Sequence, residues 1–401
     1  MTTSFGPSGA PGIAGAGRSG GSGTSMYGYG MDHDRVVRKE VNLGVIREMT
    51  VPEDLIYTTI APFMEVPTDD FIFDRVTPHF STGMVPARAQ NAESELAQHD
   101  FKAGGQARGS VIDWAHKDFY DATDVYNYRA AQDVLDRLGG TVNVPAYLQG
   151  SANDLASKMA RDQADRVARI HRRFEHIVMT SLSTGTYVYN GTNISFETPW
   201  GQPADQRNIT PESGSYAADT HDPINDILKI QEDAFERYGI QFDRVMGSRK
   251  AFNTFFRSKK FIPRTGFTEQ QGIGMDDMPY LVGNAWGPQA GLDFVMQQTG
   301  LRPIIHDSVY REDGVAKRYL PQDQLIFLPS ENSIRAFDST AIGFAKTCTS
   351  PHPEGNFTAG MYEWEDTQKD PWQLVAGTGI KAYPIMNHME CVYSMKLELP
   401  A

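Results

Sequence analysis

The sequence predicts an α+β fold, and three observations along the chain support that prediction. A Gly-rich start and a proline-punctuated stretch come first, where little apolar surface is available to build a core. A long amphipathic helix then begins at Ser151. Alternating helices and strands follow it, before a β-rich C-terminal stretch. At about 150 residues per domain, the 401 residues allow two or three domains.

Composition and charge exclude several classes of protein. The chain has 37 Lys and Arg against 50 Asp and Glu, a formal net charge of −13. A nucleic-acid coat or an anionic-lipid binder needs a basic surface instead. No run approaches the roughly 18 apolar residues of a membrane span, and the start lacks a signal peptide, so we expect no membrane partner. Only Cys348 and Cys391 occur, and we expect free thiols in a reducing compartment.

The first 30 residues contain ten Gly and a single charge, Arg18, and we expect a flexible tail. Gly15, Gly17 and Gly20 fit a G-x-G-x-x-G dinucleotide pattern. Because Gly and Ser flank this pattern where a strand and a helix are needed, it predicts no cofactor. Residues 36–80 contain four prolines, which remove backbone donors, so this segment is expected to lie extended over another surface.

Residues 81–119 are predicted to form a long hairpin. Met84–Ala89 and Ala107–Asp113 can pair as strands, with a polar tip from Asn91 to Gly105 between them. Arms of that length reach roughly 20–40 Å at about 3.3 Å per residue. Since such a hairpin is unstable alone, we expect it to require a partner surface.

The strongest predicted helix covers residues 151–184, with Ser151 and Asp154 as a capping pair and Gly185 as its stop. One apolar stripe is expected to be its buried face, and the arginines are expected to fill most of the solvent face. The stripe comprises Ala156, Ala160, Ala164, Val167, Ile170, Phe174, Ile177 and Val178. Residues 186–196 follow as a predicted hairpin with Asn190-Gly191 as its turn.

Residues 215–345 are predicted to form one α/β unit. Asp222-Pro223 begins a helix that ends at Tyr238-Gly239, Phe242–Gly247 is a strand, and Ser248 caps a further helix. The predicted buried face of the first helix comprises Ile224, Ile227, Leu228, Ala234, Phe235 and Tyr238. Around a turn at Asp313-Gly314, helix and strand continue to alternate through the runs 292–297, 303–310, 317–320 and 324–329. The C-terminal stretch ends in two strand-like runs within Gly379–Leu399.

No arrangement of side chains predicts catalysis. His171, Glu175 and His176 resemble a zinc-protease signature, but two His five residues apart diverge around a helix, so we expect polar residues on a helix surface. His352 and Glu354 lack the Cys pair of zinc deaminases, and no phosphate loop or nucleophile elbow occurs. Both Cys are expected to be core or strand thiols. The sequence therefore predicts no catalytic residue, no metal site, no cofactor and no enzyme.

More than a quarter of the chain precedes the first segment that is expected to build a core. The sequence shows no obvious partners for this part within its own chain. Its backbone groups need partners, and its apolar patches need cover. Other copies of the same chain are the economical source of both, through strand addition and the contact of an extended strap with a neighbour. The sequence therefore indicates a structural assembly subunit.

With this order of elements, the sequence resembles the major capsid proteins of tailed bacteriophages, which have the Hong Kong 97-type fold, and among them the lambda gpE-like group. The resemblance covers about Val51 to Leu399. It is carried by the junction of the long helix with a strand, by the opening of the next helix, and by strand-and-turn runs of the C-terminal half. These segments are Arg172–Tyr189, Asp222–Ile227, Arg244–Phe261, Thr299–Pro329 and Asp370–Leu397.

The resemblance implies that successive parts of the chain form different structural parts of a capsid subunit. Residues 1–80 are expected to be a tail and N-arm, and 81–119 an extended loop that overlaps a neighbouring subunit. Residues 120–214 with 346–401 are expected to form a peripheral domain with a long spine helix, and 215–345 an axial domain. Such subunits form the hexamers and pentamers of an icosahedral shell. The implied location is the virion, after assembly in the host cytoplasm.

The implied partners are other copies of the chain, with scaffold, portal and decoration proteins as further partners that the resemblance allows. The shell encloses double-stranded DNA without sequence-specific binding, and an acidic lining leaves that polymer mobile. Arg88, Lys102 and Arg108 on the extended loop are candidate contacts to acidic patches of neighbouring subunits, as against plain solubilising charges.

Two other functions stay open at this point. A cargo-holding nanocompartment has the same fold, and shells packed with an enzyme rather than a genome would favour it. A soluble α/β enzyme centred on residues 215–345 needs a pocket in which titratable groups converge.

Overall fold

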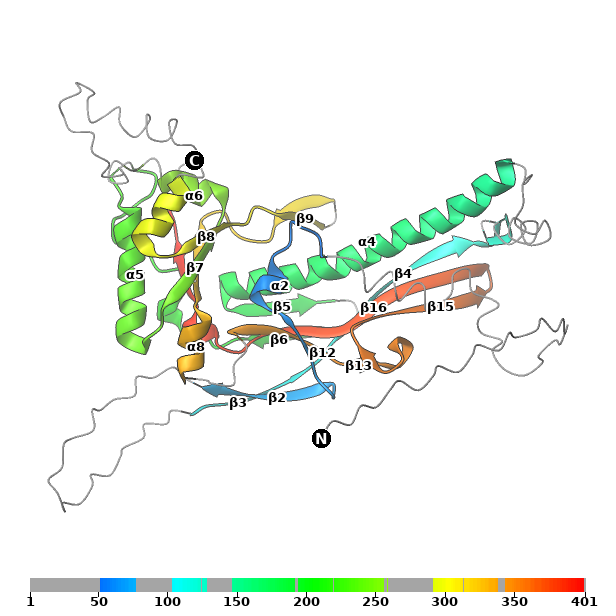
Figure 1. Ribbon diagram of the computed structural model, residues 1–401, viewed down its shortest axis with the longest axis horizontal. Coiled ribbons are helices and arrows are strands. Elements are labelled where there is room, and N and C mark those ends of the chain that lie inside the picture. The colour runs from blue at the N-terminus through cyan, green and yellow to red at the C-terminus, as the bar shows by residue number, and fades with distance from the viewer. Residues whose placement is uncertain are drawn as a thin grey trace, which may run out of the picture.

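The computed structural model describes residues 51–76, 103–123, 125–127, 146–191, 194–218, 220–255, 258, 291–312, 314–337 and 343–399. One long helix and a sheet of long strands follow the long axis of the molecule, and a second sheet with its helices lies at one end (Figure 1). This mixture of sheets and helices confirms the predicted α+β class.

The long helix α4 spans Ala146–Thr184, so it begins before the predicted start at Ser151. Ser151 lies inside the helix because Ala, Leu and Gln in the preceding turn are good helix formers, and a capping pattern alone does not end a helix. Gly185 ends α4 as predicted, with φ 72° and its N–H bonded to Ser181 O at 2.8 Å. At about 1.5 Å per residue, its 39 residues make a rod of roughly 58 Å.

The buried face of α4 follows the predicted stripe only in its C-terminal half. The members of the predicted stripe that are buried there are Val167, Ile170, Phe174, Ile177 and Val178. Ala160 and Ala164 are exposed, and Gln163 and Arg166 are buried in their place. Arg166 can be buried because its Nη1 pairs with Asp118 Oδ2 at 2.7 Å and its Nε donates to Thr378 Oγ1 at 3.1 Å. A search for apolar residues alone could not find this part of the face.

A five-stranded sheet, called here the long sheet, packs against α4 (Figure 1). Its strands are β1 (Phe63–Glu65), β4 (Asp113–Asp121), β12 (Ala345–Thr349), β15 (Met361–Lys369) and β16 (Trp372–Met386). The order is β1-β12-β16-β15, and β4 also pairs with β16. β16 is antiparallel to its three neighbours, whereas β1 is parallel to β12. Segments from both ends of the sequence therefore build one sheet.

Residues 51–66, called here the strap, pack on the body of their own chain. This corrects the expectation that the leading part of the chain finds its contacts on neighbouring subunits. The short helix α2 (Tyr57–Ile60) enters the core, where Leu55, Tyr57, Ile60 and Ala61 are buried. β1 then completes the strap by pairing with β12. Burial of these apolar groups offsets the entropy of ordering the strap. The sequence did not show this because the apolar residues between the prolines follow no regular period.

The second sheet has the order β17-β11-β7-β8. Its strands are β7 (Phe242–Gly247), β8 (Arg302–Ile305), β11 (Gln324–Pro329) and β17 (Tyr393–Lys396). The helical segments that follow or precede these strands are α5 (Pro223–Tyr238), α6 (Arg249–Phe255), residues 291–299 and α8 (Glu331–Phe337). β17 lies in the C-terminal stretch that is predicted to belong to the peripheral domain. It pairs with β11, which lies in the predicted axial domain. The domain limits themselves stay a prediction.

Helix α5 has the predicted ends but a narrower buried face. Asp222 Oδ1 accepts the Asn225 N–H at 3.2 Å, and Gly239 follows with φ 68°. Ile227 and Ala234 are buried as predicted, whereas Leu228 and Phe235 are exposed. A polar residue, Asp226, is buried on this helix instead, where its carboxylate accepts the Ser213 N–H and the Tyr216 hydroxyl, each at 3.0 Å.

The described part of the chain also contains four two-stranded sheets. They are β2 (Asp70–Val76) with β3 (Ala103–Ser110), β5 (Thr186–Asn190) with β6 (Ser195–Pro199), β9 (Val309–Glu312) with β10 (Val315–Arg318), and β13 (Pro351–His352) with β14 (Thr358–Ala359). Glu312 pairs with Val315 around the predicted turn, but Asn190 pairs with Ser195, so the β5–β6 connection is longer than an Asn-Gly turn. Short 3-10 turns are η1 (Ala204–Gln206), η3 (Pro353–Gly355) and η4 (Met389–Cys391).

Candidate assembly surfaces

The ribbon of β2 and β3 carries Arg108, one of the three predicted contact residues. Arg108 lies opposite Ile72 of β2, and nothing is described of its side chain. Arg88 and Lys102 lie outside the described residues, as does Met84–Ala89, the strand predicted to pair with this segment. The strand partner that the structure gives is β2, which lies within the predicted N-arm. The contacts of the three residues with neighbours stay a prediction.

The root of this ribbon is fixed to the long sheet by Asp69. Its carboxylate accepts from Lys381 Nζ and from Ser350 Oγ, each at 2.7 Å, and its carbonyl accepts the Val111 N–H at 2.8 Å. The hydrogen bond from Lys381, and then that from Ser350, lowers the pKa of Asp69 below its usual value. The ribbon therefore leaves the body from a defined point, and beyond Asp69 its strands pair with each other.

Helix α5 lies at the end of the molecule (Figure 1) and exposes two apolar side chains, called here the apolar strip of α5. Leu228 is 42% and Phe235 49% exposed, and their seven-residue spacing places them on one face of the helix. Between them, Gln231 Nε2 donates to Thr299 O at 3.0 Å, which joins α5 to the helical segment 291–299. That segment adds Met296, a further exposed apolar side chain. Exposed apolar side chains on one face of a helix can be covered by another molecule.

The β9–β10 hairpin presents a second exposed surface. Val309 and Val315 are exposed, while Tyr310 packs its ring 5.0 Å from that of His176 on α4 and 4.9 Å from that of Tyr319. An isolated two-stranded hairpin is marginal in water, so these ring contacts at its base help to hold it. The register places Val309 and Val315 on opposite faces of the hairpin.

A buried carboxylate joins three parts of the subunit. Glu175 of α4 is 0% exposed, and its Oε2 accepts the N–H groups of Ile56 at 3.1 Å and Tyr57 at 2.8 Å. Its Oε1 lies 3.0 Å from Nε2 of His306, which follows β8, although the two atoms are not aligned as a hydrogen bond. Strap, spine helix and second sheet therefore meet at one side chain.

His171 and Glu175 are thus buried, which corrects the expectation of polar residues on a helix surface. Burial lowers the pKa of His171 to about 4, and burial followed by the charge of Glu175 raises the pKa of Tyr57. The Tyr57 hydroxyl therefore keeps its proton, and it shares a hydrogen bond with His171 Nδ1, 2.5 Å away. The available signal was spacing: residues 171, 174, 175 and 178 share the face on which Phe174 and Val178 are buried.

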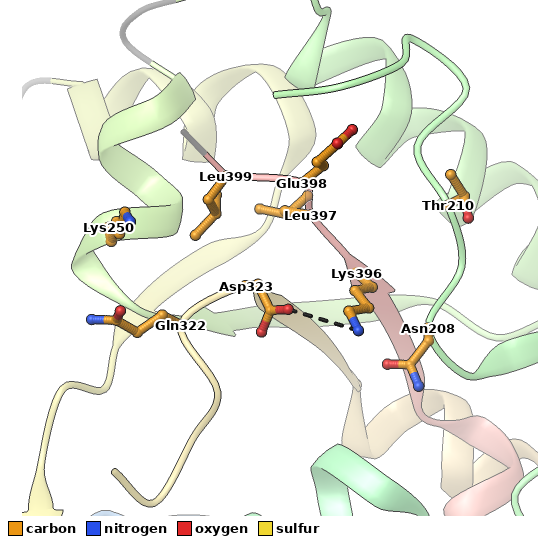
Figure 2. Close-up of a pocket in the computed structure, with 9 residues that line it drawn as sticks. All are labelled: Asn208, Thr210, Lys250, Gln322, Asp323, Lys396, Leu397, Glu398 and Leu399. Atoms are coloured by element: carbon orange, nitrogen blue, oxygen red, sulfur yellow. Dashed lines mark ion pairs between the residues drawn. The ribbon is translucent and has the colours of Figure 1, made fainter. Parts of the chain in front are cut away.

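Two surface recesses contain titratable side chains. Figure 2 shows the first, beside β17, where Lys396 Nζ lies 3.9 Å from Asp323 Oδ2. The second lies against α5, where the hydrogen bond from Lys229 to Glu212 raises the pKa of that lysine. Both pairs are solvent-exposed, and a lysine that serves as a general base needs a lowered pKa. Neither recess has an arrangement typical of catalysis.

Cys348 and Cys391 are free and buried, as predicted. Burial raises the pKa of both thiols, which disfavours the thiolate that a nucleophile requires. Within the described ranges, no group of three or more His, Cys, Asp and Glu side chains could hold a metal ion. In the same part of the chain, no helix has the length and apolar character needed to cross a membrane.

Comparison with known proteins gives one family match. A family model described as phage major capsid protein E matches residues 108–371. This range contains α4, the strands β7, β8 and β11 of the second sheet, and β4, β12 and β15 of the long sheet. No curated protein sequence matches the chain.

Two solved structures are similar over nearly their whole length. One, from Escherichia coli CFT073, is described as the presumed capsid protein of a prophage. It has 15% sequence identity and a TM-score of 0.54, over 90% of this chain and 99% of that chain. The other is a phage-related protein from Bordetella bronchiseptica RB50, with 12% identity and a TM-score of 0.52, over 90% of this chain and 98% of that chain. The shared fold is the Hong Kong 97-type fold that the sequence predicts.

Proposed function

Because this chain belongs to the phage major capsid protein E family, and is therefore a subunit of a phage capsid shell, we propose that it forms the hexamers and pentamers of an icosahedral shell. In this arrangement the body around α5 meets its copies at the five- and six-fold axes. The β2–β3 ribbon carries residues 81–102 onto a neighbouring subunit. The observation that carries the proposal is the family match, which covers more than half of the chain.

Two features of the subunit support this arrangement. The ribbon has its root fixed at Asp69, and its strands pair with each other rather than with the body. The apolar strip of Leu228 and Phe235 lies at the end of the molecule, where a neighbour around an axis can cover it. A two-stranded ribbon and an exposed apolar strip are both more stable when a second subunit packs on them.

The proposed content of the shell is double-stranded DNA held without sequence-specific binding. The formal net charge of −13 disfavours a tight grip on phosphates, which leaves the packaged polymer mobile. Since the family is that of a phage capsid, the protein belongs in the virion. We place its assembly in the host cytoplasm, with scaffold, portal and decoration proteins as further partners.

The proposed role is structural and not enzymatic. The buried acidic and basic groups that the structure describes join segments of the fold, as Glu175 and Arg166 do. In the recess against α5, the hydrogen bond to Glu212 raises the pKa of Lys229, so this lysine holds its proton more firmly rather than less. These are the properties of structural ion pairs.

The experiment replaces residues 91–102 with an equal number of Gly and Ser residues, which leaves every described β2–β3 pair in place. We expect the parent chain to form closed shells by light scattering and negative-stain microscopy. The variant should keep the parent circular dichroism spectrum and melting temperature but stop at free subunits or single capsomers, because the overlap with a neighbour is lost.

Equal assembly of parent and variant would contradict the role of the extended loop. A parent that stays a monodisperse monomer under all conditions would contradict the shell itself. Shells purified from cells with a protein cargo and no nucleic acid would favour the nanocompartment instead.

A further inference from the structure

The loop between β13 and β14 holds an aromatic residue in a conformation that it rarely adopts. Phe357 has φ 56°, and Asn356 before it has φ 57°. Asn tolerates the left-handed region, whereas a bulky side chain is strained there. Phe357 is also 75% exposed, so burial of its ring within its own subunit does little to offset that strain. Strain of this kind is stored where function requires it.

The strained conformation is fixed by the hydrogen bonds of the loop. The Phe357 N–H donates to His352 O and the Asn356 N–H donates to Pro353 O, each at 3.1 Å. His352 pairs with Thr358 across the loop, and its Nδ1 accepts the Glu354 N–H at 3.1 Å. The loop is therefore closed on itself, and its backbone is held in place at Phe357.

The base of the loop rests on the long sheet. The His352 ring stacks on Tyr362 of β15 with centroids 3.8 Å apart and an interplanar angle of 9°. The Tyr362 hydroxyl donates to Asp113 Oδ1 of β4 at 2.5 Å. The Tyr362 ring also covers Gly379 of β16, where an added Cβ would come within 2.6 Å of it. Three strands thus support the loop.

This support lies on the face of the sheet that points away from α4. Leu374 and Ala376 of β16 pack with Met159 of α4, so the even-numbered side chains of this stretch face the helix. Side chains alternate along a strand, so Gly379 and the Tyr362 ring on it face the opposite way. Figure 1 shows β13 on that side of the sheet. Phe357 therefore projects from a surface that the subunit's own spine helix does not cover.

We propose that Phe357 is an anchor that inserts into an apolar recess on a second copy of this chain, an inference that rests on the proposed shell function. A preorganised loop loses little conformational entropy when its side chain is buried. One aromatic ring buries about 150–250 Å², far less than the roughly 800 Å² per partner of a stable binary complex. In a shell the same contact recurs in every subunit, so many weak contacts add. A second copy therefore fits this loop better than a foreign partner.

The test compares three variants of the full-length chain. Phe357→Gly removes the ring and the strain together, so the variant subunit should melt at the parent temperature or about 1–2 °C above it. Its critical concentration for assembly should rise at least about tenfold, because truncation of a buried anchor typically costs that much affinity. Phe357→Leu should recover most of the loss. Asn356→Gly changes the neighbouring residue, keeps the ring and should assemble like the parent.

The readouts are a thermal melt of the dissociated subunit and a light-scattering titration of assembly. Assembly of Phe357→Gly at the parent concentration would overturn the anchor and leave the proposed shell intact. A melting temperature clearly below the parent would also overturn it, because Phe357 would then stabilise its own subunit. A parent chain that fails to assemble would overturn the proposed function, and this inference with it.

Discussion

Glu175 shows how one buried charge can define a junction between distant segments. Its Oε2 accepts two strap N–H groups, so removal of the carboxylate leaves two buried donors without a partner, and its Oε1 lies beside His306. Such groups cost more when unpaired than they contribute when paired. The residue therefore acts on the stability of the subunit rather than on any chemical step.

Glu175→Gln should lower the free energy of unfolding by about 1–3 kcal/mol, because a neutral amide replaces the carboxylate that accepts the two strap N–H groups. Urea unfolding of the dissociated subunit measures this. Asp165→Asn is the matched control, because Asp165 lies on the exposed face of the same helix and should change stability by less than about 0.5 kcal/mol. Equal effects of the two substitutions on the free energy of unfolding would show that Glu175 stabilises the subunit no more than an exposed carboxylate of α4 does.

His171 should make the subunit less stable in mild acid. Its folded pKa of about 4 lies below the unfolded value of about 6.5, so the unfolded chain takes up this proton first. The contribution of His171 is complete above about pH 6.5 and is lost progressively as the pH falls toward about 4. Between pH 7 and pH 5 the parent should lose about 2 kcal/mol more than His171→Gln, which still accepts the Tyr57 hydroxyl.

Urea unfolding of parent and variant at the two pH values checks this prediction. The other titrating groups are common to both chains, so the difference isolates residue 171. Identical pH profiles would contradict it.

At the scale of elements, the long sheet depends on two glycines in β16. Gly377 lies under the Trp364 ring and Gly379 under the Tyr362 ring, where an added Cβ would approach ring atoms to within 2.2 Å and 2.6 Å. Glycine usually weakens a strand, and here the ring on the neighbouring strand fills the space that its missing side chain leaves. The Tyr362 ring cannot move aside freely because Asp113 and His352 hold it.

Gly379→Ala should therefore lower the free energy of unfolding by about 1–3 kcal/mol through overpacking. Gly343→Ala is the control, since an added Cβ there meets its nearest neighbour at an ordinary 3.7 Å. Chemical unfolding followed by tryptophan fluorescence measures both variants. If Gly379→Ala proves as stable as the control, the rings are not the platform described for the β13–β14 loop.

The sequence predicted those elements that have local signals at their ends. Helix α5 has its Asp222 cap and Gly239 stop, and α4 has its Gly185 stop, each where the residue type predicts it. Elements that depend on distant partners could not be predicted in this way. The burial of Arg166 needs Asp118 and Thr378, and that of Glu175 needs the strap. No hydrophobic period contains this information.

At the scale of the whole molecule, some segments pack into the core of their own subunit, and others stay exposed on its surface. The strap that was expected to rely on neighbours packs into the core of its own chain and adds β1 to its own sheet. The open features are the β2–β3 ribbon, the apolar strip of α5 and the Phe357 loop. The family could be recognised from the order of elements, but the surfaces could not, because exposure is a property of the folded chain.

A cryo-electron microscopy reconstruction of particles formed by the purified chain tests the central claim most directly. It should show a closed icosahedral shell with five- and six-fold capsomers, residues 81–102 lying over a neighbouring subunit, and Phe357 buried between two subunits. Particles without closed symmetry, or a chain that remains a single subunit at every concentration, would contradict the account.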